Sequence, residues 1–187
     1  MFKTLIGVII VAVAVIVTFM FIDPNIGVTT ANTGVITSGV TSIPEGYNTY
    51  MIEGEVSKPG NYVLADGATM SDLIEAAGGV TEYADELAYY DTATVDAGLT
   101  YYIPSKYDTS NVCSLVEIDK VNINSDSAET LLTLNVFTSS VANSVVSYRS
   151  ENGEFKTIED LLNVYGIGNA TYRKLRNYVT LHQWHSY

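Results

Sequence analysis

The residues whose types and spacing best suggest chemistry are Gly166-Ile167-Gly168, which directly precede the helical pattern NATYRKLRNYV. Both glycines can take positive φ and carry no Cβ, so the backbone amides of the turn can face outward together. The amides lie at the N-terminus of the next helix, where the helix dipole favours an anion. We therefore expect a phosphate-binding turn, with Ile167 as the apolar residue that packs between two helices.

Side chains near this turn can extend a contact along a phosphate backbone. Arg173 and Lys174 lie one turn into the predicted helix, where they can meet an adjacent phosphate. Such a contact recognises the DNA backbone and no bases, so binding should be independent of sequence and sensitive to salt. The predicted DNA-binding residues are Gly166, Ile167, Gly168, Asn169, Thr171, Arg173, Lys174, Lys156, Ser139 and Ser140.

Short helices are predicted on both sides of the turn, between residues 121 and 181. Thr157-Ile158-Glu159-Asp160 has the pattern of a capping box at the start of the preceding helix. Upstream, Ser127 can cap the helix AETLLTL, and Ser139 or Ser140 can cap the next one. Together these patterns predict an all-α domain of two helical hairpins.

The first of these hairpins has a different turn, Asn135-Val136-Phe137-Thr138, in place of the two glycines. Asparagine tolerates the left-handed region, whereas a β-branched valine or threonine does so poorly. We expect that the first hairpin has lost its outward-facing amides and serves as a packing partner. Most phosphate contact should then fall on the second hairpin.

A smaller α+β unit precedes the helical region. In residues 50–56 apolar and polar residues alternate, as in a half-buried strand, and residues 61–64 return as a second strand after a Pro-Gly turn. Thr69 and Asp72 are spaced as an N-cap with an acidic first turn, and Gly78-Gly79 should end that helix. A third strand is predicted over residues 99–103.

The N-terminal residues predict a membrane anchor. Residues 5–22 form an 18-residue run without a charge, which spans roughly 27 Å as a helix and suffices for a bilayer core. Lys3 before the run and Asp23 after it place the N-terminus inside and the rest of the chain on the extracellular or periplasmic side. A cleaved signal peptide is the alternative, although the run is long for one and lacks a small-x-small site.

Charge and residue types limit the function classes. The net charge is -12, but residues 1–111 hold 3 basic and 13 acidic residues, whereas residues 112–187 hold 6 and 8. The acidity therefore lies mainly upstream of the hairpins. A single cysteine, Cys113, and a pair of histidines near the C-terminus do not make a metal site. The carboxylates have no partner nucleophile or metal cluster, so we predict no catalytic residue, no metal, no cofactor and no enzyme activity.

Three motifs of the helical region are specific in sequence and spacing: Val121-Asn122-Ile123-Asn124, Tyr148-Arg149-x-x-Asn152-Gly153-x-Phe155 and Leu161-x-x-Val164-x-Gly166-Ile167-Gly168. Through these motifs the region resembles the tandem helix-hairpin-helix domain of the competence protein ComEA family. The resemblance implies a surface receptor that binds extracellular double-stranded DNA in natural transformation and passes it to DNA-uptake channel proteins.

The α+β unit resembles the soluble ligand-binding β-grasp (SLBB) module, through IEGEVSKPGNYVL, TMSDLIEAAGGVT and LTYYIP. In the ComEA family the module before the hairpins can promote self-association, so the resemblance implies that possibility here. The alternative function is a surface adaptor or a ligand- or glycan-binding protein whose hairpins mediate protein assembly. The predicted order is an anchor (1–22), a flexible linker (23–46), the SLBB-like domain (47–106), a linker (107–117) and the hairpin domain (118–182).

Overall fold

The computed structural model describes residues 34–35, 43–108 and 115–183, and these belong to one compact unit. Within those ranges, no helix has both the length and the apolar character needed to cross a membrane. The predicted anchor over residues 1–22 lies outside the described residues, as does Cys113.

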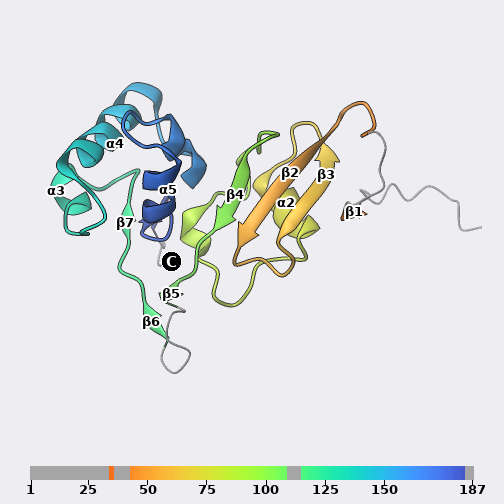
Figure 1. The fold of residues 1–187 in the computed structure, drawn as a ribbon, viewed down its shortest axis with the longest axis horizontal. Coiled ribbons are helices and arrows are strands. Elements are labelled where there is room, and N and C mark those ends of the chain that lie inside the picture. The colour runs from red at the N-terminus through yellow and green to blue at the C-terminus, as the bar shows by residue number, and fades with distance from the viewer. Residues whose placement is uncertain (1–33, 36–42, 109–114, 184–187) are drawn as a thin grey trace, which may run out of the picture. The chain divides into compact units, whose positions relative to one another are not determined.

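A four-stranded sheet with the order β1-β3-β2-β4 forms the first module (Figure 1). Strand β2 (Tyr47–Gly54) pairs antiparallel with β3 (Gly60–Ala65) and parallel with β4 (Thr100–Ile103). Helix α2 (Met70–Ala76) packs against the sheet. The predicted strand-strand-helix-strand order is confirmed, and β1 (Gly34–Val35), from the predicted linker, adds a short edge strand beside β3.

The alternation of residues 50–56 places every second side chain in the core, since Tyr50, Ile52 and Val56 are all buried. Gly54 continues the alternation for a different reason. Its φ is +88°, and a Cβ there would lie 2.1 Å from the carbonyl oxygen of Ile103. The close approach of β2 to the end of β4 therefore requires glycine at this position.

The ends of α2 follow the predicted capping chemistry. Thr69 is the N-cap, its backbone N–H donates to Asp72 Oδ2 at 2.8 Å, and its hydroxyl accepts from the Asp72 N–H. The hydrogen bonds from Thr69 lower the pKa of Asp72. Gly78 and Gly79, both with positive φ, follow the helix. This helix therefore begins and ends where its sequence predicts.

The C-terminal module contains two helical hairpins around one core (Figure 1). Short helix α3 (Ala128–Leu131) precedes α4 (Ser139–Asn152), and the 3₁₀ helix η2 (Ile158–Asn163) precedes α5 (Asn169–Leu175).

The prediction that this module is entirely helical is wrong in one respect. Strand β7 (Val121–Asn122) pairs parallel with β8 (Val179–Thr180), so a two-stranded sheet ties the two ends of the module together. Two residues per strand are too few to produce a periodic pattern in the sequence.

The two modules pack against each other. The connecting chain forms β5 (Tyr107–Asp108) and β6 (Val116–Glu117), which pair antiparallel. The 3₁₀ helix η1 (Glu86–Ala88) belongs to the first module, yet Ala88 lies in the hydrophobic core of the helical module. The helical module is therefore completed by residues that precede it.

A buried carboxyl group forms the centre of this contact. Glu159 is 3% exposed, and its Oε1 accepts hydrogen bonds from the Tyr102 N–H and from the Tyr172 hydroxyl, both at 2.8 Å. Burial raises the pKa of Glu159 to about 7 and also raises the pKa of Tyr172, whose hydroxyl therefore remains a donor. Since Tyr102 is in β4, the contact fixes η2 and α5 beside the sheet.

Candidate nucleic-acid interface

The two hairpin turns share one architecture. In the second turn the Ile167 N–H donates to the carbonyl of Val164 at 3.0 Å, and in the first the Phe137 N–H donates to Leu134 at 3.1 Å. Ile167 and Phe137 are 4% and 5% exposed. As predicted for Ile167, each turn is anchored by one apolar side chain between its helices.

The backbone of the two turns differs at one position. Gly166 has φ +88°, whereas Val136, which holds the corresponding place, has no positive φ. A residue with positive φ rotates the peptide groups next to it. Gly166 is exposed, and a Cβ added to it would meet no other atom within 4 Å. The two turns therefore differ in backbone conformation, as we expect from the β-branched Val136 in the first turn.

The helix starts after the two turns also differ. Thr138 is the N-cap of α4, and its hydroxyl accepts from the Val141 N–H at 3.3 Å. The expectation that Ser139 or Ser140 caps this helix is wrong, since both are exposed residues of its first turn. At α5 the N-cap is Gly168, which has no side chain to satisfy the first-turn N–H groups, so an external acceptor can take them.

Two cations lie on the helix that follows the second turn. Arg173 and Lys174 are exposed, and neither forms an ion pair with any of the described residues. Asn169 is exposed at the start of the same helix, and Thr171 is half-buried. Arg176 is not free in this way, because its guanidinium lies 3.5 Å from the centre of the Tyr102 ring and 4.0 Å from Glu53 Oε2.

Lys156 is separated from the turn by a whole helix. It precedes η2, while Gly166 follows the end of η2, so six residues of 3₁₀ helix, roughly 12 Å, separate the two ends. The side chain of Lys156 is exposed, and its backbone N–H donates to Asp160 Oδ2 at 2.7 Å. Arg173 and Lys174 therefore lie on the helix that follows the turn, whereas Lys156 lies at the opposite end of η2 from the turn.

Tyr165 is an exposed residue of the second turn that the sequence prediction missed. It is 88% exposed, directly before Gly166. The sequence places this aromatic residue between the apolar Val164 and a turn glycine, but its exposure follows from how the turn packs.

A cavity of about 420 Å³ lies beside α5, between the two modules. The helical side contributes Arg173, Arg176 and Asn169, and the first module contributes Glu53 and the loop residues 98–100. Glu53 places a carboxylate near the cations of the hairpin, where it opposes the binding of an anion.

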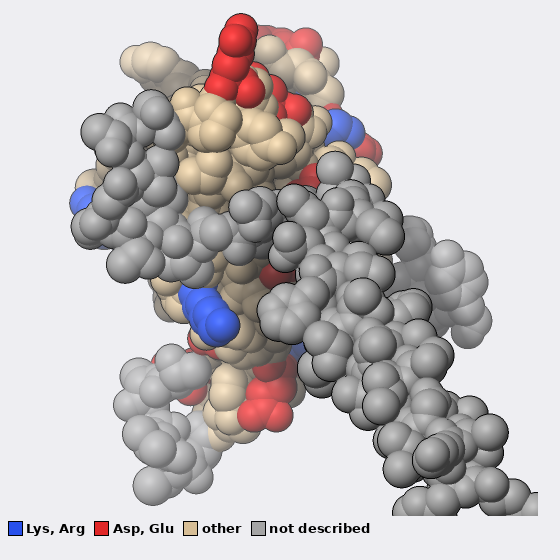
Figure 2. Space-filling model, turned by 90° about the vertical axis from the view of Figure 1, so that its right-hand side faces the viewer, with Lys and Arg blue, Asp and Glu red and all other residues tan. Residues whose placement is uncertain are grey.

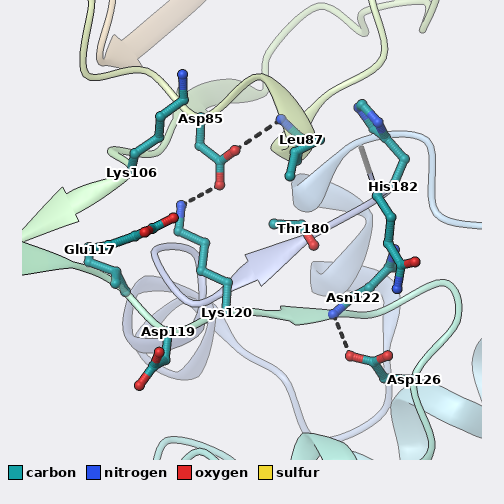
Figure 3. Close-up of a pocket in the computed structure, with 12 residues that line it drawn as sticks. Asp85, Leu87, Lys106, Glu117, Asp119, Lys120, Asn122, Asp126, Thr180 and His182 are labelled. Atoms are coloured by element: carbon teal, nitrogen blue, oxygen red, sulfur yellow. Dashed lines mark hydrogen bonds and ion pairs between the residues drawn. The ribbon is translucent and has the colours of Figure 1, made fainter. Parts of the chain in front are cut away.

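A second cavity, of about 580 Å³, lies where the connecting chain passes between the modules (Figure 3). Lys120 crosses it and donates to Asp85 Oδ2 at 2.5 Å and to the Ser105 carbonyl at 2.7 Å. Burial lowers the pKa of Lys120, and the Asp85 carboxylate opposes this effect. His182 Nε2 lies 3.0 Å from the carbonyl oxygens of Glu86 and Tyr89.

These contacts satisfy the central polar groups of the second cavity within the chain. We therefore interpret this cavity as a polar contact between the modules rather than as a ligand-binding site.

The charge of the surface also limits where an anion can bind. On the face shown in Figure 2, acidic side chains gather at the top and bottom of the view, and the basic side chains stand apart. No continuous basic strip crosses the part of this face that the structure describes. Within the hairpin module, the exposed cations Arg173 and Lys174 lie on α5, so α5 is the better location for a polyanion there, although the acidic first module lies beside it.

Comparison with known proteins agrees with both modules. The Helix-hairpin-helix motif model matches residues 116–180, and the SLBB domain model matches residues 49–88. ComE operon protein 1 of Bacillus subtilis is 35% identical over 139 residues, which cover 70% of this chain and 68% of that protein.

Two further similarities are shorter. The human Endonuclease/exonuclease/phosphatase family domain-containing protein 1 is 46% identical over 54 residues, only 10% of its own length. A protein of Haemophilus influenzae is 39% identical over 69 residues, 62% of its length. The first similarity covers too little of the human protein to transfer any activity to this chain.

Proposed function

The chain belongs to the family of ComE operon protein 1, and we propose that it binds double-stranded DNA without sequence preference and without enzymatic activity. The observation that carries the proposal is the second hairpin turn. It combines an exposed Gly166 at φ +88°, a helix start without a side-chain cap, and two exposed cations without an ion pair. A phosphate of a DNA backbone would satisfy all three features.

In the proposed complex, one phosphate accepts hydrogen bonds from the backbone N–H groups of Gly168 and the first turn of α5. Arg173 and Lys174 contact neighbouring phosphates, and Asn169 and Thr171 are the polar side chains nearest to the turn. Ile167 belongs to this site through its buried side chain, which packs between the helices and holds the turn in place. Lys156, Ser139 and Ser140 belong to a wider contact, which a longer duplex reaches.

The affinity of one copy should be modest because few cations are available. Neutralising two or three phosphates gives a slope of about -2 to -3 in a plot of log affinity against log salt concentration. The negative charge of the first module repels DNA and lowers this affinity further. Several copies on one surface would raise the apparent affinity without any new contact.

We further propose that the protein is a DNA receptor of the outer surface in DNA uptake. Residues 1–22 would anchor it in the membrane with the N-terminus inside, and residues 23–46 would act as a spacer. The SLBB-like domain would support self-association, and the bound DNA would pass to channel proteins. The family membership and the uncharged N-terminal run support these roles.

A fluorescence anisotropy titration tests DNA binding. The full chain is kept in mild detergent and titrated against two duplexes of equal length and unrelated sequence. A fragment of the hairpin domain alone is unsuitable, because Ala88 and Tyr102 of the first module complete its packing. We expect equal affinities for both duplexes and a loss of about 10- to 60-fold between about 50 and 200 mM salt. No binding at about 50 mM salt would refute the proposal.

The second candidate function is a surface adaptor whose hairpins assemble proteins. The acidic excess of the first 111 residues favours it, because that charge opposes DNA. A chain that binds neither duplex but forms stable oligomers in sedimentation experiments would support the adaptor instead.

A further inference from the structure

Tyr165 is the most exposed large apolar side chain among the described residues. It is 88% exposed, while the next in order, Val116 and Leu115, are 58% and 57% exposed. Other tyrosines of this structure pack their rings, as Tyr148 does on Phe155 and Tyr90 on His182. Tyr165 has no ring partner within the part of the chain that the structure describes, so packing does not explain an aromatic residue here.

The backbone on either side holds this ring at the tip of the turn. Val164 and Ile167 are 3% and 4% exposed, and the hydrogen bond between them closes the turn around Tyr165 and Gly166. In the first hairpin the corresponding exposed residue is Asn135, a polar residue that suits such a position. Tyr165 therefore stands on a well-anchored backbone turn, with its aromatic ring exposed to solvent.

The surroundings of the ring favour a planar ligand over an apolar protein surface. Its nearest exposed neighbours along the chain are Asn163 and Gly166, neither of which is a large apolar residue. It also directly precedes the glycine of the proposed phosphate-binding turn, about 3.8 Å away between Cα atoms. A group joined to a phosphate through one sugar has the reach to lie on this ring.

We propose that Tyr165 is a stacking platform for a nucleobase that is not paired in a duplex, in a single strand or at a frayed end. The proposal rests on the phosphate-binding role of the Gly166–Gly168 turn and adds a substrate class to it. Every base has a flat face that can stack on an aromatic ring, so this contact needs no sequence preference. In an intact duplex the bases stack on one another, and the same ring finds only the sugar-phosphate edge.

The stacking contact should depend little on salt, because it involves no charged group. It would supply affinity that the few cations of the hairpin do not, and it would make the chain bind exposed single strands in addition to duplex DNA.

The test compares two probes on the full chain by competition anisotropy. One probe is single-stranded oligothymidylate, and the other is a relaxed, covalently closed circular duplex, which has no ends to fray. The Tyr165→Ala variant should lose about 5- to 100-fold of its affinity for the oligomer and stay within about twofold for the circle. Tyr165→Trp should keep the affinity for the oligomer, and Tyr47→Ala, which removes a partly exposed tyrosine of the first module, should change neither.

The outcomes separate this inference from the proposed function. If the wild type binds the circle but Tyr165→Ala binds the oligomer as well as the wild type does, the role of Tyr165 is refuted. Equal losses for both probes, or a Tyr165→Trp variant as weak as Tyr165→Ala, also refute it. If the wild type does not bind the circle at all, the proposed duplex binding fails, whatever the oligomer does.

Discussion

Replacing the buried Glu159 with glutamine should change how the stability of the protein depends on pH. The carboxyl group accepts hydrogen bonds from Tyr102 and Tyr172 where the two modules meet, and burial raises its pKa to about 7. A glutamine has the same shape, and its amide oxygen can accept the same two hydrogen bonds. The variant should therefore fold, but without a group that ionises inside the protein.

The direction and size of the change in stability follow from the pKa of Glu159 in the unfolded and in the folded chain. Glu159 starts from a value of 4.5 when it is not perturbed, and its folded value is higher. A raised pKa means that the folded state favours the protonated form, so the stabilising contribution is complete below about pH 4.5 and is lost as pH rises through about 7. The difference of about 2.5 pH units corresponds to a loss of about 3 kcal/mol.

Urea unfolding at a series of pH values between about 4.5 and 8 measures this contribution. Relative to the wild type, Glu159→Gln should become more stable by about 3 kcal/mol as pH rises across that interval. Glu154→Gln, at an exposed position before η2, is the matched control and should follow the wild type. If the difference between Glu159→Gln and the wild type were the same at every pH, the burial argument would be wrong.

Three more predictions concern the sheet and the charges of the hairpin. Gly54→Ala should destabilise the protein by about 3 kcal/mol or more in urea unfolding, because the new Cβ would overlap the Ile103 carbonyl; a loss under about 1 kcal/mol would contradict the close approach. Arg173→Glu with Lys174→Glu should weaken duplex binding at least tenfold and make the salt slope shallower by about 2; an unchanged slope would remove both residues from the contact. Glu53→Gln should strengthen duplex binding about two- to fivefold at low salt, an effect that should vanish at high salt; weaker binding would show that this carboxylate supports the site.

Much of the first module could be predicted from its sequence, because its signals are local. Alternation over residues 50–56 reflects a strand with one buried face, and the Thr69–Asp72 pair is a capping motif that acts within one turn. The left-handed backbone of Gly166 was also predictable, because glycine adopts positive φ without a steric cost. The same expectation for Gly168 is wrong, since its φ is -95°.

The features that could not be predicted depend on partners far away in the chain. Glu159 lies in a capping motif, and its burial depends on Tyr102, 57 residues earlier. Strands β7 and β8 form only because residues 121 and 179 meet in the folded module. The exposure of Tyr165 depends on how the turn packs, since the sequence shows an aromatic residue between two helices, which more often faces a core.

The central claim is that the backbone of the Gly166 turn binds a DNA phosphate, and a pair of matched variants tests it most directly. Gly166 and Gly153 have φ +88° and +87°, both are exposed, and neither would place a Cβ within 4 Å of another group. Alanine at either position should cost stability, about 1–3 kcal/mol, because each forces a positive φ on a residue that carries a Cβ. Anisotropy titrations should show at least tenfold weaker duplex binding for Gly166→Ala and unchanged binding for Gly153→Ala. Equal affinities for the two variants would contradict the claim.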